Sequence, residues 1–261
     1  MKVIFLGTGT SQGVPVIGCT CKVCTSSDKK DARLRTSVLV QADGLNIVID
    51  SGPDFRQQML SVGIKRLDGL VFTHAHKDHI AGLDDIRGFN YVQKEAINVY
   101  CNAIVEDQIR KEFAYIFDEI KYPGVPELNI HRINKNLPFE IGNSVRIEPI
   151  EVMHYKLPVL GFKITETKSS ESFVYITDAN LIASAEIEKI KNCNTLVLNA
   201  LRKEKHISHF TLTEALEVIE HINPKHAYLT HISHQLGIHK EVNADLPVPV
   251  QLAYDGLTIE I

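Results

Sequence analysis

Short apolar runs rich in β-branched residues recur along the chain, and amphipathic patterns separate some of them. Several of these runs are apolar at every position, which is typical of strands buried on both faces. The expected strands are Val3–Leu6, Val38–Ala42, Asn46–Ile49, Leu70–Phe72, Asn98–Tyr100, Val145–Ile150, Phe173–Ile176, Thr195–Leu198 and Ala227–Leu229. The expected helices are Asp54–Val62, Ala103–Phe117, Ser184–Lys191 and Thr211–Ile222. This mixture predicts an α/β fold built in layers.

The last of these helices has the clearest pattern. Apolar residues fall at i, i+3, i+4 and i+7 between Leu212 and Ile219, so they share one face of a helix. Thr211 and Glu214 have the spacing of a capping box, and Pro224 ends the pattern. The sequence therefore predicts a capped helix that packs one face on a sheet.

Composition narrows the classes of protein that fit. No repeat, low-complexity tract or linker interrupts the 261 residues, so we expect 1–261 to form a single domain. The 28 basic and 32 acidic residues give a net charge of −4. This charge creates no positive electrostatic potential that would attract nucleic acid non-specifically. No segment has the apolar length of a membrane span, and no signal-peptide cleavage site follows Met1. We expect a cytoplasmic protein with no membrane partner, and a homodimer remains open.

Four side chains that can bind metal fall within six residues, directly after the expected strand Leu70–Phe72. They form the motif His74-Ala75-His76-Lys77-Asp78-His79. Open α/β sheets place their sites at the carboxyl ends of strands, where these side chains can point into one crevice. One divalent ion could take His74 and His76, and a second could take Asp78 and His79. A single loop histidine is usually just solvated, but four such groups together argue against that interpretation.

Two ions so close together need further ligands, ideally one bridging carboxylate and one imidazole each. Suitable residues follow later expected strands: His154 after 145–152, Asp178 after 173–177 and His231 after 227–230. Each of the three leaves a strand end, as the first group does. The pattern predicts a two-metal site.

With these residues in order, the sequence resembles the metallo-β-lactamase superfamily from Gly7-Thr8-Gly9-Thr10 to His231. The resemblance implies an αββα sandwich of two mixed sheets with helices on the outer faces and a metal site at the sheet edges. It implies that His74, His76 and His154 hold one metal, that Asp78, His79 and His231 hold the other, and that Asp178 bridges them. It also implies that the segment Asp50-Ser51-Gly52-Pro53-Asp54-Phe55-Arg56 orients the metal ligands through hydrogen bonds. A plain turn and helix cap would explain Asp54 equally well.

Three of the five cysteines crowd into Cys19-Thr20-Cys21-Lys22-Val23-Cys24. Soft thiolates prefer zinc, and a structural zinc needs four ligands in a closed tetrahedron. His234, three residues beyond His231, could be the fourth ligand. The alternative is three reduced thiols without a metal. Cys101 and Cys193 have no such partners and are expected to be small buried hydrophobic residues.

The cysteine cluster, together with Gly7-Thr8-Gly9-Thr10-Ser11 and His231-Ile232-Ser233-His234, resembles one branch of that superfamily. This branch contains the phosphoribosyl 1,2-cyclic phosphate phosphodiesterases and their relatives, which carry a Cys3His zinc beside a binuclear site. The resemblance therefore implies one structural zinc and two catalytic divalent ions, with manganese or zinc at the catalytic pair.

The chemistry of such a pair suits attack at phosphorus. A hydroxide between two ions about 3.5–4 Å apart is a strong nucleophile near neutral pH, and the ions can also bind phosphate oxygens. His209 is the candidate proton donor to the leaving group, because it lies just before the helix beginning near Thr211, whose N-terminus favours an anion. Asp78 is a candidate proton carrier. The alternative for His209 is an ordinary loop histidine.

The leading hypothesis is hydrolysis of a cyclic or small-molecule phosphodiester such as phosphoribosyl 1,2-cyclic phosphate. The stretch from His209 to His231 also resembles tRNA 3′-processing enzymes of the superfamily, but the chain shows no basic arm and no His-Glu-Ala-Thr element between Asp178 and His209. Hydrolysis of a lactone or another carbon ester is a further alternative, since the same ions can polarise a carbonyl. A metal-stabilised binding module fits least, because every expected ligand position is filled.

Overall fold

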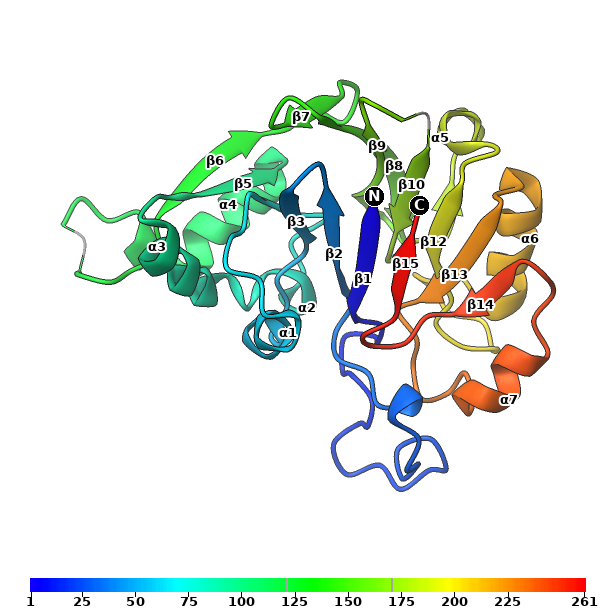
Figure 1. Cartoon of the computed structure of the whole chain (residues 1–261). Helices are drawn as coiled ribbons and strands as arrows, with labels where there is room; N and C mark the ends of the chain where they lie inside the picture. The colour runs from blue at the N-terminus through cyan, green and yellow to red at the C-terminus, as the bar shows by residue number, and fades with distance from the viewer. Residues whose placement is uncertain (121, 170) are drawn as a thin grey trace.

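Two β-sheets pack face to face in the computed structural model of the chain, and helices cover the outer face of each sheet (Figure 1). The structure describes residues 1–120, 122–169 and 171–261. In spatial order, the strands of the first sheet are β15 (Thr258–Glu260), β1 (Lys2–Gly7), β2 (Ser37–Ala42), β3 (Leu45–Ile49), β4 (Gly69–Val71), β5 (Ile97–Cys101) and β6 (Leu128–Arg132). Those of the second sheet are β11 (Leu181–Ile182), β8 (Val145–His154), β9 (Leu157–Glu166), β10 (Ser172–Ile176), β12 (Thr195–Asn199), β13 (His226–Thr230) and β14 (Val250–Leu252), with β7 (Phe139–Ile141) paired to β8.

The helices divide between the two outer faces. Those packed on the first sheet are α1 (Phe55–Val62), α2 (Lys77–Ile80), α3 (Arg87–Gln93) and α4 (Ala103–Glu112), with the 3₁₀ turns η2 (Leu83–Ile86) and η3 (Ala114–Ile116). Those packed on the second sheet are α5 (Ser184–Ile190), α6 (Leu212–Ile222) and α7 (His239–Ala244). A further 3₁₀ turn, η1 (Lys29–Asp31), follows the cysteine loop. None of the helices among the described residues has the length and apolar character that crossing a bilayer requires.

The main hydrophobic core lies between the two sheets. It takes fully buried side chains from both, such as Phe5 on β1 and Phe162 on β9. Burying an apolar side chain of this size stabilises the fold by roughly 1.5–3 kcal/mol. A further apolar layer lies between each sheet and the helices that cover it. The predicted αββα sandwich with two mixed sheets is confirmed.

Both sheets join an antiparallel half to a parallel half. In the first sheet, β3, β4, β5 and β6 run parallel to one another. In the second sheet, β10, β12, β13 and β14 do the same. The carboxyl ends of parallel strands share one edge of a sheet, and this arrangement brings together loops that are distant in the sequence.

Each expected strand and helix overlaps an observed one, with differences at the ends. β8 runs on to His154, beyond the expected end at Ile150. The helix expected at 103–117 is too long: α4 ends at Glu112 because Phe113 leaves the helical region, with φ −116° and ψ 42°. The capping box of α6 is confirmed, since Thr211 and Glu214 each accept a hydrogen bond from the other's backbone N–H.

Candidate metal centre

The seven histidines and aspartates expected at the two-metal site converge in the structure. The four-residue helix α2 carries Asp78 and His79, and His74 and His76 lie in the loop between β4 and α2. His154 is the last residue of β8. Asp178 lies two residues beyond β10, and His231 directly follows β13. The candidate site therefore draws on both sheets.

His74, His76 and His154 form the first group, with one possible ligand atom from each inside a span of 4.8 Å. His74 Nε2 lies 3.0 Å from His76 Nδ1. The Nδ1 atoms of His74 and His154 have hydrogen-bond partners outside the group. His74 Nδ1 lies 3.0 Å from Thr73 Oγ1, and His154 Nδ1 lies 2.9 Å from the carbonyl oxygen of Ser208. Such contacts fix the ring orientation and leave Nε2 free for an ion.

Asp78, His79, Asp178 and His231 form the second group, and all four are buried. His79 Nε2 lies 3.3 Å from a carboxylate oxygen of Asp78 and 3.3 Å from one of Asp178. His231 Nε2 lies 3.1 Å from the other oxygen of Asp178. Both Nε2 atoms nevertheless make no hydrogen bond among the described residues. Buried polar atoms are rarely left unsatisfied, so nitrogen and oxygen atoms that converge without bonding fit an ion held between them.

Asp178 belongs to both halves of the cluster. Its ligand atoms lie within 4.8 Å of those of the second group and also within 4.8 Å of those of His154 and His209. Thr177 Oγ1 donates a hydrogen bond of 2.6 Å to Asp178 Oδ2 and steadies the carboxylate. This is the placement that a bridging carboxylate needs.

The carboxylates and the imidazoles of the second group stabilise each other's charged forms. Burial would raise the pKa values of Asp78 and Asp178, but His79 and His231 outweigh it and lower both. Burial would lower the pKa values of the two histidines, but the carboxylates outweigh it, so that the pKa of His79 is well above its usual range and that of His231 is about 9. A cation would compete with the protons on these rings, so its affinity should rise with pH.

Asp50, at the end of β3, anchors the second group from behind. His79 Nδ1 lies 2.7 Å from Asp50 Oδ2, and the side chain of Asp50 is fully buried. Thr73 donates to the same carboxylate from its backbone N–H at 2.9 Å and from its hydroxyl at 2.8 Å. Burial raises the pKa of Asp50, while His79 opposes that shift. The arrangement aims His79 Nε2 into the cluster, as expected for this segment.

His209 lies within the cluster. Its ring stacks on that of His231 with centroids 4.7 Å apart, and its Nδ1 lies 3.9 Å from Asp178 Oδ1. Burial and the charge of His231 lower the pKa of His209 to about 2, so its imidazole is neutral. Asp78 is ionised, because its pKa is also lowered. An ionised Asp78 suits the role of ligand better than that of proton donor.

Cys19, Cys21, Cys24 and His234 form a separate cluster beside the first. The three Sγ atoms lie 3.3, 3.3 and 3.5 Å from His234 Nδ1. In a tetrahedral zinc site the sulfur and nitrogen ligands lie roughly 3.6 Å apart, which follows from bond lengths of about 2.3 and 2.0–2.1 Å. The donor set and spacing therefore fit zinc. Cys101 and Cys193 are buried apart from this cluster, as expected.

A hollow of about 450 Å³ lies at the first group. Two of its lining residues are His76 and His154, and the others are Tyr155, Lys156, Leu157, Ile207 and Ser208. The segment 88–135 contributes none of these residues. Thr73 and Ser208 were not anticipated from the sequence, although Thr73 directly precedes the histidine motif.

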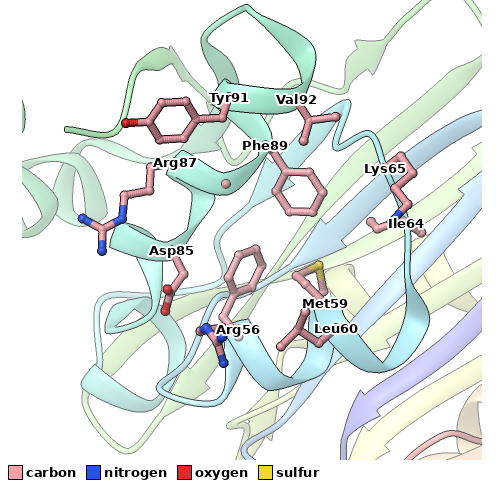
Figure 2. Close-up of a pocket in the computed structure, with 12 residues that line it drawn as sticks. Arg56, Met59, Leu60, Ile64, Lys65, Asp85, Arg87, Phe89, Tyr91 and Val92 are labelled. Carbon is pink, nitrogen blue, oxygen red and sulfur yellow. The ribbon is translucent and has the colours of Figure 1, made fainter. Parts of the chain in front are cut away.

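Another hollow of about 450 Å³ lies between α1 and α3, away from the histidines (Figure 2). Met59, Phe89 and Val92 give it an apolar lining, and Arg56 lies at its rim. None of the side chains in the candidate metal clusters lines it. The chemistry therefore belongs to the hollow lined by His76 and His154.

Comparison with known proteins decides the family. A family model described as a β-lactamase superfamily domain matches residues 45–232, which include all seven clustered residues. The crystal structure of a diphosphatase from the PhnP family superposes with a TM-score of 0.90 at 40% identity, over 100% of this chain and 97% of that one. The chain belongs to the β-lactamase superfamily and, within it, to the PhnP family. Both candidate metal-binding clusters are present in this PhnP-family chain.

Two further relatives show how far the similarity extends. An octanoyltransferase of Porphyromonas gingivalis is 42% identical over 259 residues, which cover 98% of this chain. The PhnP-family chain spans only 51% of the length of that relative. The Zn²⁺-bound PqqB structure from Methylobacterium extorquens has a TM-score of 0.79 at 18% identity over 100% of both chains, which shows a shared fold.

Proposed function

We propose that this protein is a binuclear metal-dependent phosphodiesterase that hydrolyses a cyclic or small-molecule phosphodiester, such as phosphoribosyl 1,2-cyclic phosphate. The observation that carries the proposal is the position of Asp178, within ligand distance of both the second group and His154. A shared carboxylate with imidazoles on either side suits two close divalent ions, which we propose to be manganese or zinc. We assign zinc to the Cys3His cluster.

In this proposal, two divalent ions, when bound, activate a water molecule and neutralise charge on the phosphate oxygens. The chain's own residues position the reactants. Asp50, Thr73 and Ser208 fix the orientation of the imidazoles, and the hollow lined by His76 and His154 admits the diester. His209 lies beside Asp178, and because its imidazole is neutral there, its ring N–H stabilises the leaving oxygen by donating a hydrogen bond rather than by transferring a proton.

Two comparisons bear on the substrate. The 40% identical relative is described as a diphosphatase, and its reaction, like that of a phosphodiesterase, takes place at phosphorus. The name octanoyltransferase belongs to a protein of about twice the length, of which this chain matches 51%. That name therefore carries no activity over to this chain. The hollow of about 450 Å³ fits a small substrate better than a folded tRNA.

The test is a substrate panel assayed with purified protein reconstituted with manganese or zinc. The panel contains phosphoribosyl 1,2-cyclic phosphate, a 2′,3′-cyclic nucleotide, bis(p-nitrophenyl) phosphate, a precursor tRNA and a lactone. We expect cleavage of the small diesters, its loss with a chelator and its recovery with added metal. Asp178→Asn should be inactive on all of them. Preference for the lactone or for the precursor tRNA would overturn the proposal.

A further inference from the structure

The backbone is strained at the candidate site in four places. The non-glycine residues with positive φ among those the structure describes are Asp43, Asp50, Lys94, Tyr155, Asp178, Asn192, Asn223 and His231. Asp50, Asp178 and His231 belong to the metal cluster or its support. Tyr155 also lies at the site, although it is neither a candidate ligand nor a support for one. Strained residues that persist at a functional site point to a role there.

Tyr155 occupies a turn position that favours glycine. It is the first residue of the two-residue turn joining β8 to β9, since His154 pairs with Leu157. Its φ is 58°, in the left-handed region that costs free energy for any residue with a Cβ atom. Its backbone N–H donates to Asn180 Oδ1 at 2.7 Å, a bond that glycine would make equally well. Packing does not account for the side chain either, because the tyrosine is 48% exposed.

The ring of Tyr155 borders the hollow lined by His76 and His154. Ile207, which is 63% exposed, lines the same hollow and adds a second apolar surface. Lys156 Nζ lies over one face of the Tyr155 ring, 5.3 Å from its centroid. An exposed aromatic ring and an exposed aliphatic side chain beside a candidate phosphate site suit a flat organic group attached to that phosphate.

We propose that Tyr155 is a substrate-binding residue that selects phosphodiesters bearing a planar aromatic or heteroaromatic group, such as a nucleobase. The proposal rests on the phosphodiesterase function above. Among the small diesters named there, it ranks a 2′,3′-cyclic nucleotide, which carries a planar base, ahead of phosphoribosyl 1,2-cyclic phosphate, which carries none. Stacking on an aromatic side chain tolerates many ring systems, because every base has a π-face. A substrate-binding role for the ring explains why tyrosine occupies a position where glycine would adopt the positive φ without strain.

The test compares phenyl phosphate with methyl phosphate, which differ only in the planar group. Calorimetric titration of the metal-loaded protein gives their affinities without relying on turnover. In Tyr155→Gly we expect roughly tenfold weaker binding of phenyl phosphate, because one stacking contact is lost, and unchanged binding of methyl phosphate. Tyr155→Phe, which keeps the ring, should bind both as the wild type does.

Thermal unfolding separates this role from a structural one. Glycine at position 155 removes the backbone strain of the left-handed conformation, which stabilises the folded protein. It also raises the conformational entropy of the unfolded chain, which destabilises the folded protein. Because these effects oppose each other, the unfolding midpoint of Tyr155→Gly should lie within about 2 °C of wild type. Lys94→Gly is the matched control. Its φ is 61° at the C-cap of α3, outside the hollow, and it should leave both affinities unchanged.

Three results would overturn the assignment of Tyr155: equal weakening of both phosphates, a large fall in the unfolding midpoint, or a wild type that does not prefer phenyl phosphate. Failure of the phosphodiesterase function would look different. The metal-loaded wild type would then cleave no diester in the substrate panel, whatever the two titrations show.

Discussion

Replacement of Asp50 by asparagine tests how the second metal-binding group is held in place. The side chain of Asp50 is fully buried and accepts hydrogen bonds from Thr73 N, Thr73 Oγ1 and His79 Nδ1. Asparagine has nearly the same shape and can still accept from Thr73 N. Its amide NH2 at the second position, however, can accept neither the proton of His79 Nδ1 nor that of Thr73 Oγ1. The substitution therefore removes the charge-assisted hydrogen bond to His79, together with the one from the Thr73 hydroxyl, with little change in packing.

The size of the effect follows from the hydrogen bond to His79. A hydrogen bond to a charged group contributes about 1.5–3 kcal/mol, and about 1.4 kcal/mol corresponds to a factor of ten in affinity. We therefore expect Asp50→Asn to weaken binding of a divalent ion by roughly 10–100-fold, the range found when residues that orient metal ligands are changed. The zinc of the Cys3His cluster should be unaffected, because Asp50 does not touch it.

The assay is competition with a chelator of known affinity, monitored for manganese or zinc on protein whose fold is checked by circular dichroism. Asp43→Asn is the matched control, since Asp43 is a carboxylate paired with Lys168 on the surface, and it should bind ions as the wild type does. Equal ion affinity in Asp50→Asn and wild type would refute the role given to Asp50.

Three other predictions follow from the same structure. His209→Ala should reduce kcat while elemental analysis finds unchanged metal content, and loss of metal would instead make His209 a ligand. A mercurial reagent should release one zinc per wild-type chain, detected with a zinc-sensitive dye, but none from Cys21→Ser. Arg33 donates to Nδ1 of the buried His239 at 3.1 Å, and burial followed by this positive charge lowers the pKa of His239 from 6.5 to about 4. Since the unfolded chain binds this proton more readily, stability should fall as pH drops from about 6.5 to about 4. Thermal melts of His239→Asn should show a weaker pH dependence, and parallel profiles would exclude this role.

Long apolar strands and a capped helix could be predicted because their patterns are local. Other elements depend on distant partners. β9 contains Pro158 and Gly161, which usually interrupt strands, yet it pairs with both β8 and β10. Gly161 is needed there because a Cβ atom would lie 2.9 Å from the carbonyl oxygen of Tyr175. β14 and β15 are only three residues long and gain their order from neighbouring strands.

The candidate site divides in the same way. The spacing of His74, His76, Asp78 and His79 is visible in one short stretch, and the structure brings His154, Asp178 and His231 to it. The carbonyl oxygen of Ser208 could not be found from sequence, because any residue carries one and only the fold places it at His154 Nδ1. The strain at Tyr155 is likewise a property of the backbone.

Elemental analysis of the reconstituted protein tests the central claim most directly, namely that two clusters of side chains hold a pair of ions and a separate zinc. After removal of loosely bound metal, we predict three ions per chain, one of them zinc retained by the thiolates. A count of two or fewer that survives repeated reconstitution would contradict the account.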